Sequence, residues 1–447
     1  MNNGSLTIKN ARIVNEGRIE EGDVLIRAGR IERVSSDIGT GQRDHVIEAA
    51  GRYLLPGFID DQVHFREPGL THKGDMATES AAAVAGGITS FMEMPNVKPP
   101  TTDREALADK YRRAAGRARA NFAFYLGATN ENLDEIKRLD NSRVCGLKVF
   151  MGSSTGNMLV DNEQTLRGIF QNAPCIITTH CESTPMINAN LERAIQRWGK
   201  NIPVTEHPHI RSSETCMASS SLAVELARSS GAHLHILHIS TADELALLDK
   251  GPVADKKITA ETCVHFLHFD SDDYVEKGNL IKCNPAIKSA SDRAALIRAL
   301  HEQQLDVLAT DHAPHTLEEK HSDDYTSAPA GMPLAQFVLP ASLELAHQGY
   351  LSIAEVVEKT AHNVARRFRV HERGFIREGY WADLVIAQDK GPYPVRRDQV
   401  ISKCGWSPFE GRSFQWQIDT TIVSGQIAWN KGRIHEVGSA QRLEFRW

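Results

Sequence analysis

Two kinds of hydrophobic pattern divide the chain into strand-rich ends and a middle of a different character. In residues 1–55 apolar and polar side chains alternate, as in SLTIKNARIV and DVLIRAGRIERVS, and this alternation is typical of short, half-buried strands. The same pattern returns near the end of the chain in ADLVIAQD and QWQIDTTIVSGQIAW. We therefore predict that residues 1–55 and 372–447 together form a small β-sandwich domain.

Residues 56–371 instead alternate short apolar runs with amphipathic stretches of helical period. The candidate strands are GFIDDQVHF, ITSFMEM, NFAFYLGA, VCGLKVF, PCIITTH, AHLHILHIS, KITAETCV and LDVLATD. This rhythm predicts an α/β fold, a TIM-type (β/α)8 barrel that carries the β-sandwich domain formed by both termini. A longer excursion at residues 270–301 precedes the eighth strand. The polar segment HTLEEKHSDDYTSAPAGMP, after that strand, predicts a surface loop.

Composition limits the kinds of partner that the protein can have. The formal net charge of the 447 residues is −6, so no overall basic field would attract nucleic acid or an anionic membrane. No apolar stretch approaches the ~18 residues that suggest a membrane span. The 7 cysteines include no CxxC pair, which suits a reducing compartment. We expect a cytoplasmic protein with no nucleic-acid or membrane partner, and the sequence leaves a homodimer open.

Side chains able to bind metal stand at or near the ends of five predicted strands. They are His64, Lys148, His180, His238 and Asp311. In a parallel barrel the C-terminal ends of all strands meet at one face, where active sites are built. Imidazole nitrogens and a carboxylate suit zinc or a similar divalent ion. The sequence therefore predicts a metal site at this face.

Lys148 differs from the other four because an ammonium group would repel a cation. Burial at a strand end lowers the pKa of a lysine, and a neutral amine can react with carbon dioxide to form a carbamate. The two oxygens of that carbamate could bridge two metals ~3.5–4 Å apart, as in two-metal hydrolytic sites.

Each of these residues also has an ordinary interpretation. A single histidine at a strand end is more often packed or solvated than a ligand, Lys148 alone would be a rim residue, and Asp311 alone could cap the next segment. The joint pattern favours the metal site. Other histidines of the middle are interpreted as structural or exposed: His207, His209, His233, His235, His265 and His268.

Several motifs resemble the amidohydrolase superfamily in its dihydroorotase form. They are PGFIDDQVHFREPG, MEMPNVKPPTT, GLKVFMGSS, LHIS, KCNPAIKS and ATDHAPH, followed by GFIREGYWADLVI and SKCGWSPFEG. The resemblance implies a zinc enzyme of pyrimidine biosynthesis with one or two ions. Its small-molecule reaction would be the reversible hydrolysis and cyclisation of dihydroorotate and N-carbamoyl-aspartate.

The resemblance also assigns roles to residues. His64 matches the second histidine of an HxH pair, Lys148 the carboxylated lysine, and His180 and His238 the ligands of the second metal. Asp311 matches a metal-bound catalytic acid and base acting on metal-activated water. The substrate carboxylate and ring would be held by Arg66, Asn96, Asn284, His315, Ala330 and Gly331.

One position departs from the family pattern, because Gln62 stands where the first histidine of HxH is usual. An amide oxygen is a weaker zinc ligand than imidazole, so the sequence leaves open whether one or two metals bind. Two other functions also stay open: an allantoinase or hydantoinase-type cyclic amidohydrolase, and a metal-depleted, non-catalytic scaffold homologue.

Overall fold

The fold is described from a computed structural model that covers residues 5–41, 45–152, 158–322, 324–438 and 440–447. Ser153 and Ser154, which end the GLKVFMGSS motif, and Asp323 of the predicted loop lie outside the described residues. Within the described part of the chain, no helix is both long and apolar enough to cross a membrane.

Parallel strands form a closed barrel in the middle of the chain. One run contains β6 (Phe58–Val63), β7 (Ile88–Glu93) and β8 (Asn121–Phe124). The other contains β9 (Leu126–Gly127), β10 (Leu147–Phe150), β11 (Ile177–His180), β12 (Leu234–Ile236), β13 (Ile258–Cys263) and β14 (Val307–Ala309). A parallel bridge between Val63 and His312 joins the first strand to the last. Each predicted strand segment is confirmed, and β8 and β9 share one of them.

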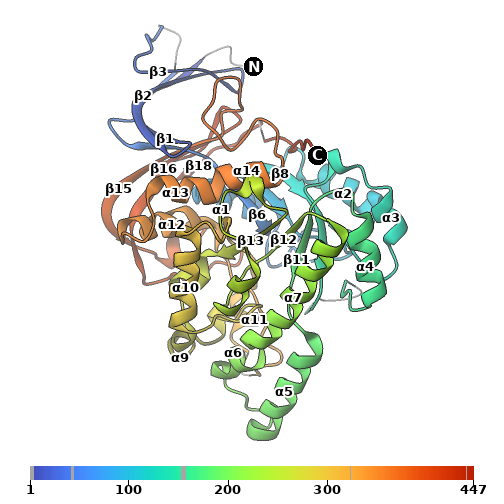
Figure 1. Ribbon diagram of the computed structural model, residues 1–447. Coiled ribbons are helices and arrows are strands. Elements are labelled where there is room, and N and C mark those ends of the chain that lie inside the picture. Colours follow the sequence, from blue (N-terminus) through green and yellow to red (C-terminus); the bar gives the residue numbers. More distant parts are fainter. Residues whose placement is uncertain (1–4, 42–44, 153–157, 323, 439) are drawn as a thin grey trace.

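Helices surround the strands, as Figure 1 shows. The longer ones are α1 (Met76–Ala85), α2 (Arg104–Ala114), α4 (Glu163–Asn172), α5 (Thr184–Trp198), α7 (Ser213–Ser230), α10 (Ala290–His301) and α12 (Val338–His347). The shorter ones are α3 (Leu133–Lys137), α6 (His207–Ile210), α8 (Val264–His268), α9 (Tyr274–Lys277), α11 (Leu317–Lys320), α13 (Ile353–Val357) and α14 (Asn363–Arg367). Local sequence fixes their starts: Asp75 and Ser289 cap α1 and α10 with reciprocal side-chain hydrogen bonds.

Both termini contribute to one sheet at the side of the barrel, which confirms that the two ends of the chain form a common β-rich part (Figure 1). Its strands are β1 (Leu6–Asn15), β2 (Arg18–Arg27), β3 (Arg30–Ser35), β4 (His45–Glu48), β5 (Tyr53–Pro56), β15 (Leu384–Pro394), β16 (Ser413–Val423), β17 (Gln426–Asn430) and β18 (Arg433–Ile434). The two ends of the chain join where β5 pairs antiparallel with β15, Leu54 opposite Ile386. These nine strands therefore form one continuous sheet.

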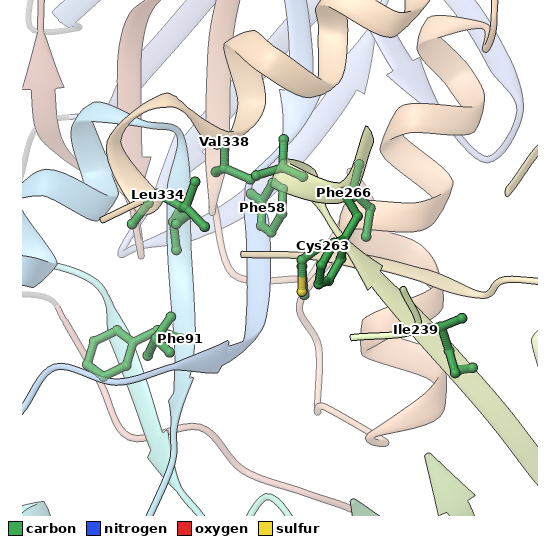
Figure 2. Packing of buried hydrophobic residues seen from close by; sticks show 14 of the residues in the cluster. Phe58, Phe91, Ile239, Cys263, Phe266, Leu334 and Val338 are labelled. Atoms are coloured by element: carbon green, nitrogen blue, oxygen red, sulfur yellow. The ribbon is translucent and has the colours of Figure 1, made fainter. Parts of the chain in front are cut away.

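Alternate residues of the barrel strands pack on opposite faces. Phe58 of β6 packs outward in a cluster with Phe266 and Val338, which Figure 2 shows beside Cys263. Its neighbour Ile59 belongs instead to a cluster that includes Phe368, at the end of α14. Apolar side chains on both faces of the strands stabilise the barrel. The polar side chains at the strand ends are therefore not needed for this packing.

The segment predicted as a surface loop is partly buried, so that prediction was wrong in part. It contains α11, and the Lys320 and Tyr325 side chains have little exposed surface. The Lys320 ammonium donates hydrogen bonds to the carbonyl oxygens of Lys282, Pro329 and Gly331. These bonds satisfy the backbone of an irregular segment, which allows it to pack inward.

Candidate active site

A cavity of about 390 Å³ opens at the C-terminal ends of the barrel strands. Side chains from strands far apart in sequence meet there because a parallel barrel delivers all its strand ends to one face. The cavity wall contains Gln62 and every residue that the sequence predicted for the site: His64, Arg66, Asn96, Lys148, His180, His238, Asn284, Asp311, His315, Ala330 and Gly331.

His180 and His238 present two ring nitrogens to the same point. Nδ1 of His180 lies 2.9 Å from Nε2 of His238, and both rings are buried. Nε2 of His180 donates to Oε2 of Glu182 over 2.8 Å, which leaves Nδ1 as a lone pair. Burial lowers the pKa of both histidines, which favours the neutral form of each ring. Two neutral imidazoles with converging nitrogens fit a divalent metal ion.

Glu182 is the residue that orients His180. Burial would raise the pKa of Glu182, but the charge of Arg211 and the hydrogen bond from His180 outweigh it and lower that pKa to about 2. The ionised carboxylate therefore accepts from both neighbours. Such a carboxylate–histidine pair is the arrangement that fixes the tautomer of a metal ligand.

Lys148 lies on β10 and is almost fully buried. Its ammonium nitrogen is 4.5 Å from the centre of the Phe150 ring. Burial lowers the pKa of Lys148 to about 8, against 10.5 for an ordinary lysine. This lowering increases the fraction of neutral amine near neutral pH, and the neutral amine is the form that carbon dioxide can carbamylate.

Asp311 accepts two hydrogen bonds at one carboxylate oxygen. Oδ1 is 3.1 Å from Nε2 of His64 and 3.1 Å from the amide nitrogen of Gln62. Burial alone would raise the pKa of Asp311, but the hydrogen bond and charge interaction with His64 outweigh it and lower that pKa to about 2. The carboxylate is thus ionised. Gln62 directs its NH₂ group, which is no metal ligand, toward this carboxylate.

Backbone strain coincides with the cavity. Arg66, His238 and Asp311 have φ angles of 72°, 42° and 51°, in the left-handed region that side chains with a Cβ rarely adopt. Each such residue costs on the order of 1–3 kcal/mol and persists only where the surrounding structure enforces it. Three such residues on one cavity wall indicate a functional site.

Arg66, His315 and Lys73 form a basic cluster on the cavity wall. The guanidinium of Arg66 donates to the Pro314 carbonyl and to Nε2 of His315, each over 3.0 Å. Lys73 pairs with Glu319 of α11 at 3.0 Å and also lies 3.0 Å from Nδ1 of His315. Burial lowers the pKa of Arg66 to about 10, so the guanidinium stays charged near neutral pH. The cluster can receive an anionic group.

The other predicted substrate residues occupy distinct places on the wall. Asn96 places Oδ1 2.8 Å from Nδ1 of His64, so in this structure it orients a predicted ligand. Gly331 has a φ of 128°, and a Cβ there would lie 2.6 Å from the Ala313 carbonyl oxygen. Ala330 and Asn284 complete the wall on this side. Only glycine therefore permits the close approach of backbone at position 331.

Sequence reasoning missed Glu182, Lys73 and Glu319. Glu182 could have been found, because it follows His180 by two residues in THCE and carboxylates often orient ligand histidines. Glu319 could not, since its contact with Lys73 spans 246 residues of chain and depends on the closed barrel. Trp406 was likewise unassigned, yet its indole nitrogen donates to the His315 carbonyl over 2.8 Å and fixes that residue.

Comparison with known proteins identifies the family. A model of the amidohydrolase family matches residues 53–428, which include the whole barrel and every cavity residue named above. The chain therefore belongs to the amidohydrolase family.

The relatives carry the names of three kinds of enzyme. A dihydroorotase from Methanosarcina mazei is 31% identical over 96% of this chain and 95% of its own length. An allantoinase from Bacillus velezensis is 30% identical over 97% of this chain and 95% of its own length. The solved structure of an L-hydantoinase (dihydropyrimidinase) from Arthrobacter aurescens superposes with a TM-score of 0.92 at 27% identity, covering 98% of this chain and 99% of that one.

Proposed function

We propose that this protein is a dihydroorotase, which interconverts dihydroorotate and N-carbamoyl-aspartate. The observation that carries this proposal is the environment of Arg66. Its guanidinium lines the cavity, its side chain is buried, and within the described part of the chain it forms no ion pair with a carboxylate. A buried charge without a counter-ion is costly. The carboxylate of dihydroorotate would supply that counter-ion, in two charge-assisted hydrogen bonds.

The charge of the whole cavity supports an anionic substrate. Apart from Lys148, which we assign to a carbamate, its wall contains the cations Arg66, Lys73 and Lys98, whereas Asp311 is the one carboxylate side chain among its described lining residues. Such a field favours a ligand that carries a carboxylate over an uncharged ring of the hydantoin or allantoin type. The relatives named dihydroorotase, allantoinase and L-hydantoinase support a cyclic amidohydrolase, and this charge distribution favours dihydroorotate among their substrates.

His180 and His238, with Lys148 as its carbamate, are the residues we assign to a firmly held metal ion, for which zinc suits the donor set. His64 and Asp311 stand next to them and are assigned to a second, weaker position. When bound, the metal supplies Lewis-acid activation of a water molecule and of the amide carbonyl.

Asp311 is assigned to proton transfer. Its Oδ1 is held by His64 and Gln62, and within the described residues Oδ2 accepts no hydrogen bond, so Oδ2 is available to take a proton. As the oxygen of water bonds to the ring carbonyl carbon, Oδ2 removes a proton from that water. The ring C–N bond then breaks, and the same oxygen returns the proton to the leaving nitrogen. In the opposite direction these steps close the ring and release water.

Arg66 and His315 orient the substrate during this reaction. A carboxylate held by Arg66 would restrict the orientation of the ring within the cavity that Asp311 also lines. Trp406 and Lys73 act indirectly by holding His315.

The test is a comparison of kcat/KM for dihydroorotate, allantoin and an uncharged hydantoin on the same purified protein. The proposal expects turnover of dihydroorotate to exceed that of the two uncharged rings. Higher kcat/KM for allantoin or for the hydantoin would replace the proposal with the corresponding function, and no turnover of any of them by the metal-loaded protein would favour a scaffold.

A further inference from the structure

Three polar side chains meet inside the barrel without belonging to the proposed catalytic site. Asp61 of β6, His235 of β12 and Glu261 of β13 have no exposed surface. One ligand atom from each lies within 4.8 Å of the others. Nε2 of His235 is 3.4 Å from Oδ2 of Asp61 and 3.2 Å from Oε2 of Glu261.

The hydrogen bond at the other ring nitrogen of His235 determines what faces the two carboxylates. Nδ1 lies 2.8 Å from the Thr259 hydroxyl, and that hydroxyl donates its own proton toward the Leu234 carbonyl over 3.4 Å. The hydroxyl oxygen can therefore accept from Nδ1–H, whereas the other tautomer would donate Nε2–H to Oε2 of Glu261. In the first tautomer Nε2 is a lone pair directed at two carboxylate oxygens. Three electron-pair donors that face one another repel unless a cation lies among them.

Asp61 gives a second, independent indication. Both of its carboxylate oxygens are buried, and within the described residues neither accepts a hydrogen bond. Burial of a carboxylate without such compensation costs several kcal/mol. The neighbouring carboxylate Asp60 shows the ordinary solution, since the Thr310 hydroxyl donates to it over 2.6 Å. Asp61 has no such hydrogen bond and lies next to the ring of His235.

We propose that Asp61, His235 and Glu261 bind a divalent transition-metal ion, with zinc as the best match, at a structural site separate from the catalytic cavity. Two carboxylates balance the charge of one divalent ion. Zinc takes nitrogen and oxygen ligands at ~2.0–2.2 Å, which for a tetrahedron places the ligand atoms about 3.3–3.5 Å apart. The two distances from Nε2 agree with this spacing. Calcium and magnesium fit poorly, because they require six or more mainly oxygen ligands.

The position of the site predicts what the ion does. It would join three strands of the barrel, and Glu261 also accepts a hydrogen bond from the His238 backbone N–H through its other oxygen. The ion is therefore expected to stabilise the fold beneath the cavity. Because all three ligands are buried, it should resist chelators that remove metal from the open cavity, and it should leave when the protein unfolds.

Metal analysis of purified proteins after extensive dialysis against a chelator tests this site. We compare the unmodified protein with Asp61→Asn and His235→Phe, and Asp60→Asn serves as the matched control. Asp60 is the adjacent buried acid on the same strand, but its carboxyl group accepts hydrogen bonds from Thr310 and Gln62 and belongs to no such cluster of described residues. The proposal expects one equivalent of metal to be lost in Asp61→Asn and in His235→Phe, with no change in Asp60→Asn.

Two further measurements keep this test independent of the dihydroorotase proposal. Lys148→Ala should lose cavity metal but keep the chelator-resistant equivalent, and anomalous diffraction from crystals of the unmodified protein should show a peak between Asp61, His235 and Glu261. The diffraction measurement uses the unmodified protein, so it does not depend on whether a variant folds. A protein that loses all its metal in Lys148→Ala, or a crystal of zinc-loaded protein without the peak, would overturn the site. In that case a proton shared by Asp61 and Glu261, and not a metal ion, would explain how the two carboxyl groups lie close together. Neither outcome depends on which substrate is turned over.

Discussion

Nε2 of His180 lies 2.8 Å from Oε2 of Glu182 and donates a hydrogen bond to it. This one contact decides which nitrogen of His180 faces the cavity, and so which atom can bind a metal. Arg211 holds the same carboxylate from the other side. The position of a proposed ligand therefore depends on a residue that does not line the cavity.

Glu182→Gln should weaken metal binding at the cavity about 10- to 100-fold, because residues that orient ligands commonly contribute that much. The amide keeps the shape of the side chain but loses the charge that both His180 and Arg211 require. Competition with a coloured chelator measures the affinity. Glu244→Gln is the matched control, since Glu244 is also buried but bonds to Ser220 and Thr241. Equal affinity in both variants would refute the orienting role.

Lys148→Ala should abolish turnover and remove the cavity metal, because no other described lining residue can form a carbamate at that place. Short carboxylic acids such as acetate should restore part of the activity by supplying the missing oxygens. Metal content and turnover, with and without acetate, are the two measurements. Unchanged metal and activity in this variant would rule out the carbamate.

Arg66→Met should reduce kcat/KM for dihydroorotate about 10- to 100-fold, the equivalent of ~1.5–3 kcal/mol for a lost charge-assisted contact. Uncharged cyclic imides should lose much less, and metal content should not change. Lys98→Met is the control, because Lys98 is an exposed cation on the same wall and should act only through screened, longer-range attraction. If Arg66→Met lowers kcat/KM equally for charged and uncharged substrates, Arg66 does not bind the carboxylate.

The sequence predicted the barrel and the strand-end residues of the cavity because topology decides where strand ends meet, whereas the substrate residues followed from the resemblance to the amidohydrolase superfamily. His64, Lys148 and Asp311 are far apart in the chain, yet a closed parallel barrel brings all three to the same face. Side-chain contacts that depend on tertiary packing could not be predicted from the order of strands. Lys320, for example, is a charged residue in a polar segment, and only the structure shows three carbonyl oxygens around its buried ammonium.

His235 illustrates the same limit in the barrel interior. Its sequence context indicated a structural or exposed residue, and the structure shows that it is buried. Neither the approach of Asp61 and Glu261 nor the Thr259 hydrogen bond could be read from the sequence, because four residues on three strands must align in register. A signal was nevertheless present, since DDQVH places two consecutive acids in a fully buried strand.

Gln62→His should add one metal ion to the cavity, relative to the unmodified protein. In the present structure the amide nitrogen of Gln62 points at Oδ1 of Asp311, so the second position has His64 as its single imidazole. Zinc binds imidazole nitrogen at ~2.0–2.1 Å and prefers it to an amide oxygen. A histidine at position 62 would restore that nitrogen beside His64, two residues away on the same strand face.

Metal content after dialysis against a mild chelator measures this gain, with Gln62→Leu as the control that removes the amide without supplying a ligand. The unmodified protein and Gln62→Leu should retain one ion in the cavity, and Gln62→His should retain two. The ion proposed at Asp61 adds equally to all three proteins and cancels in the comparison. Activity should persist with one cavity ion, since a single metal can activate water and polarise a carbonyl. If Lys148→Ala releases two firmly held ions from the otherwise unmodified protein, the second position is already complete, and Gln62 or a neighbouring group must serve as its ligand.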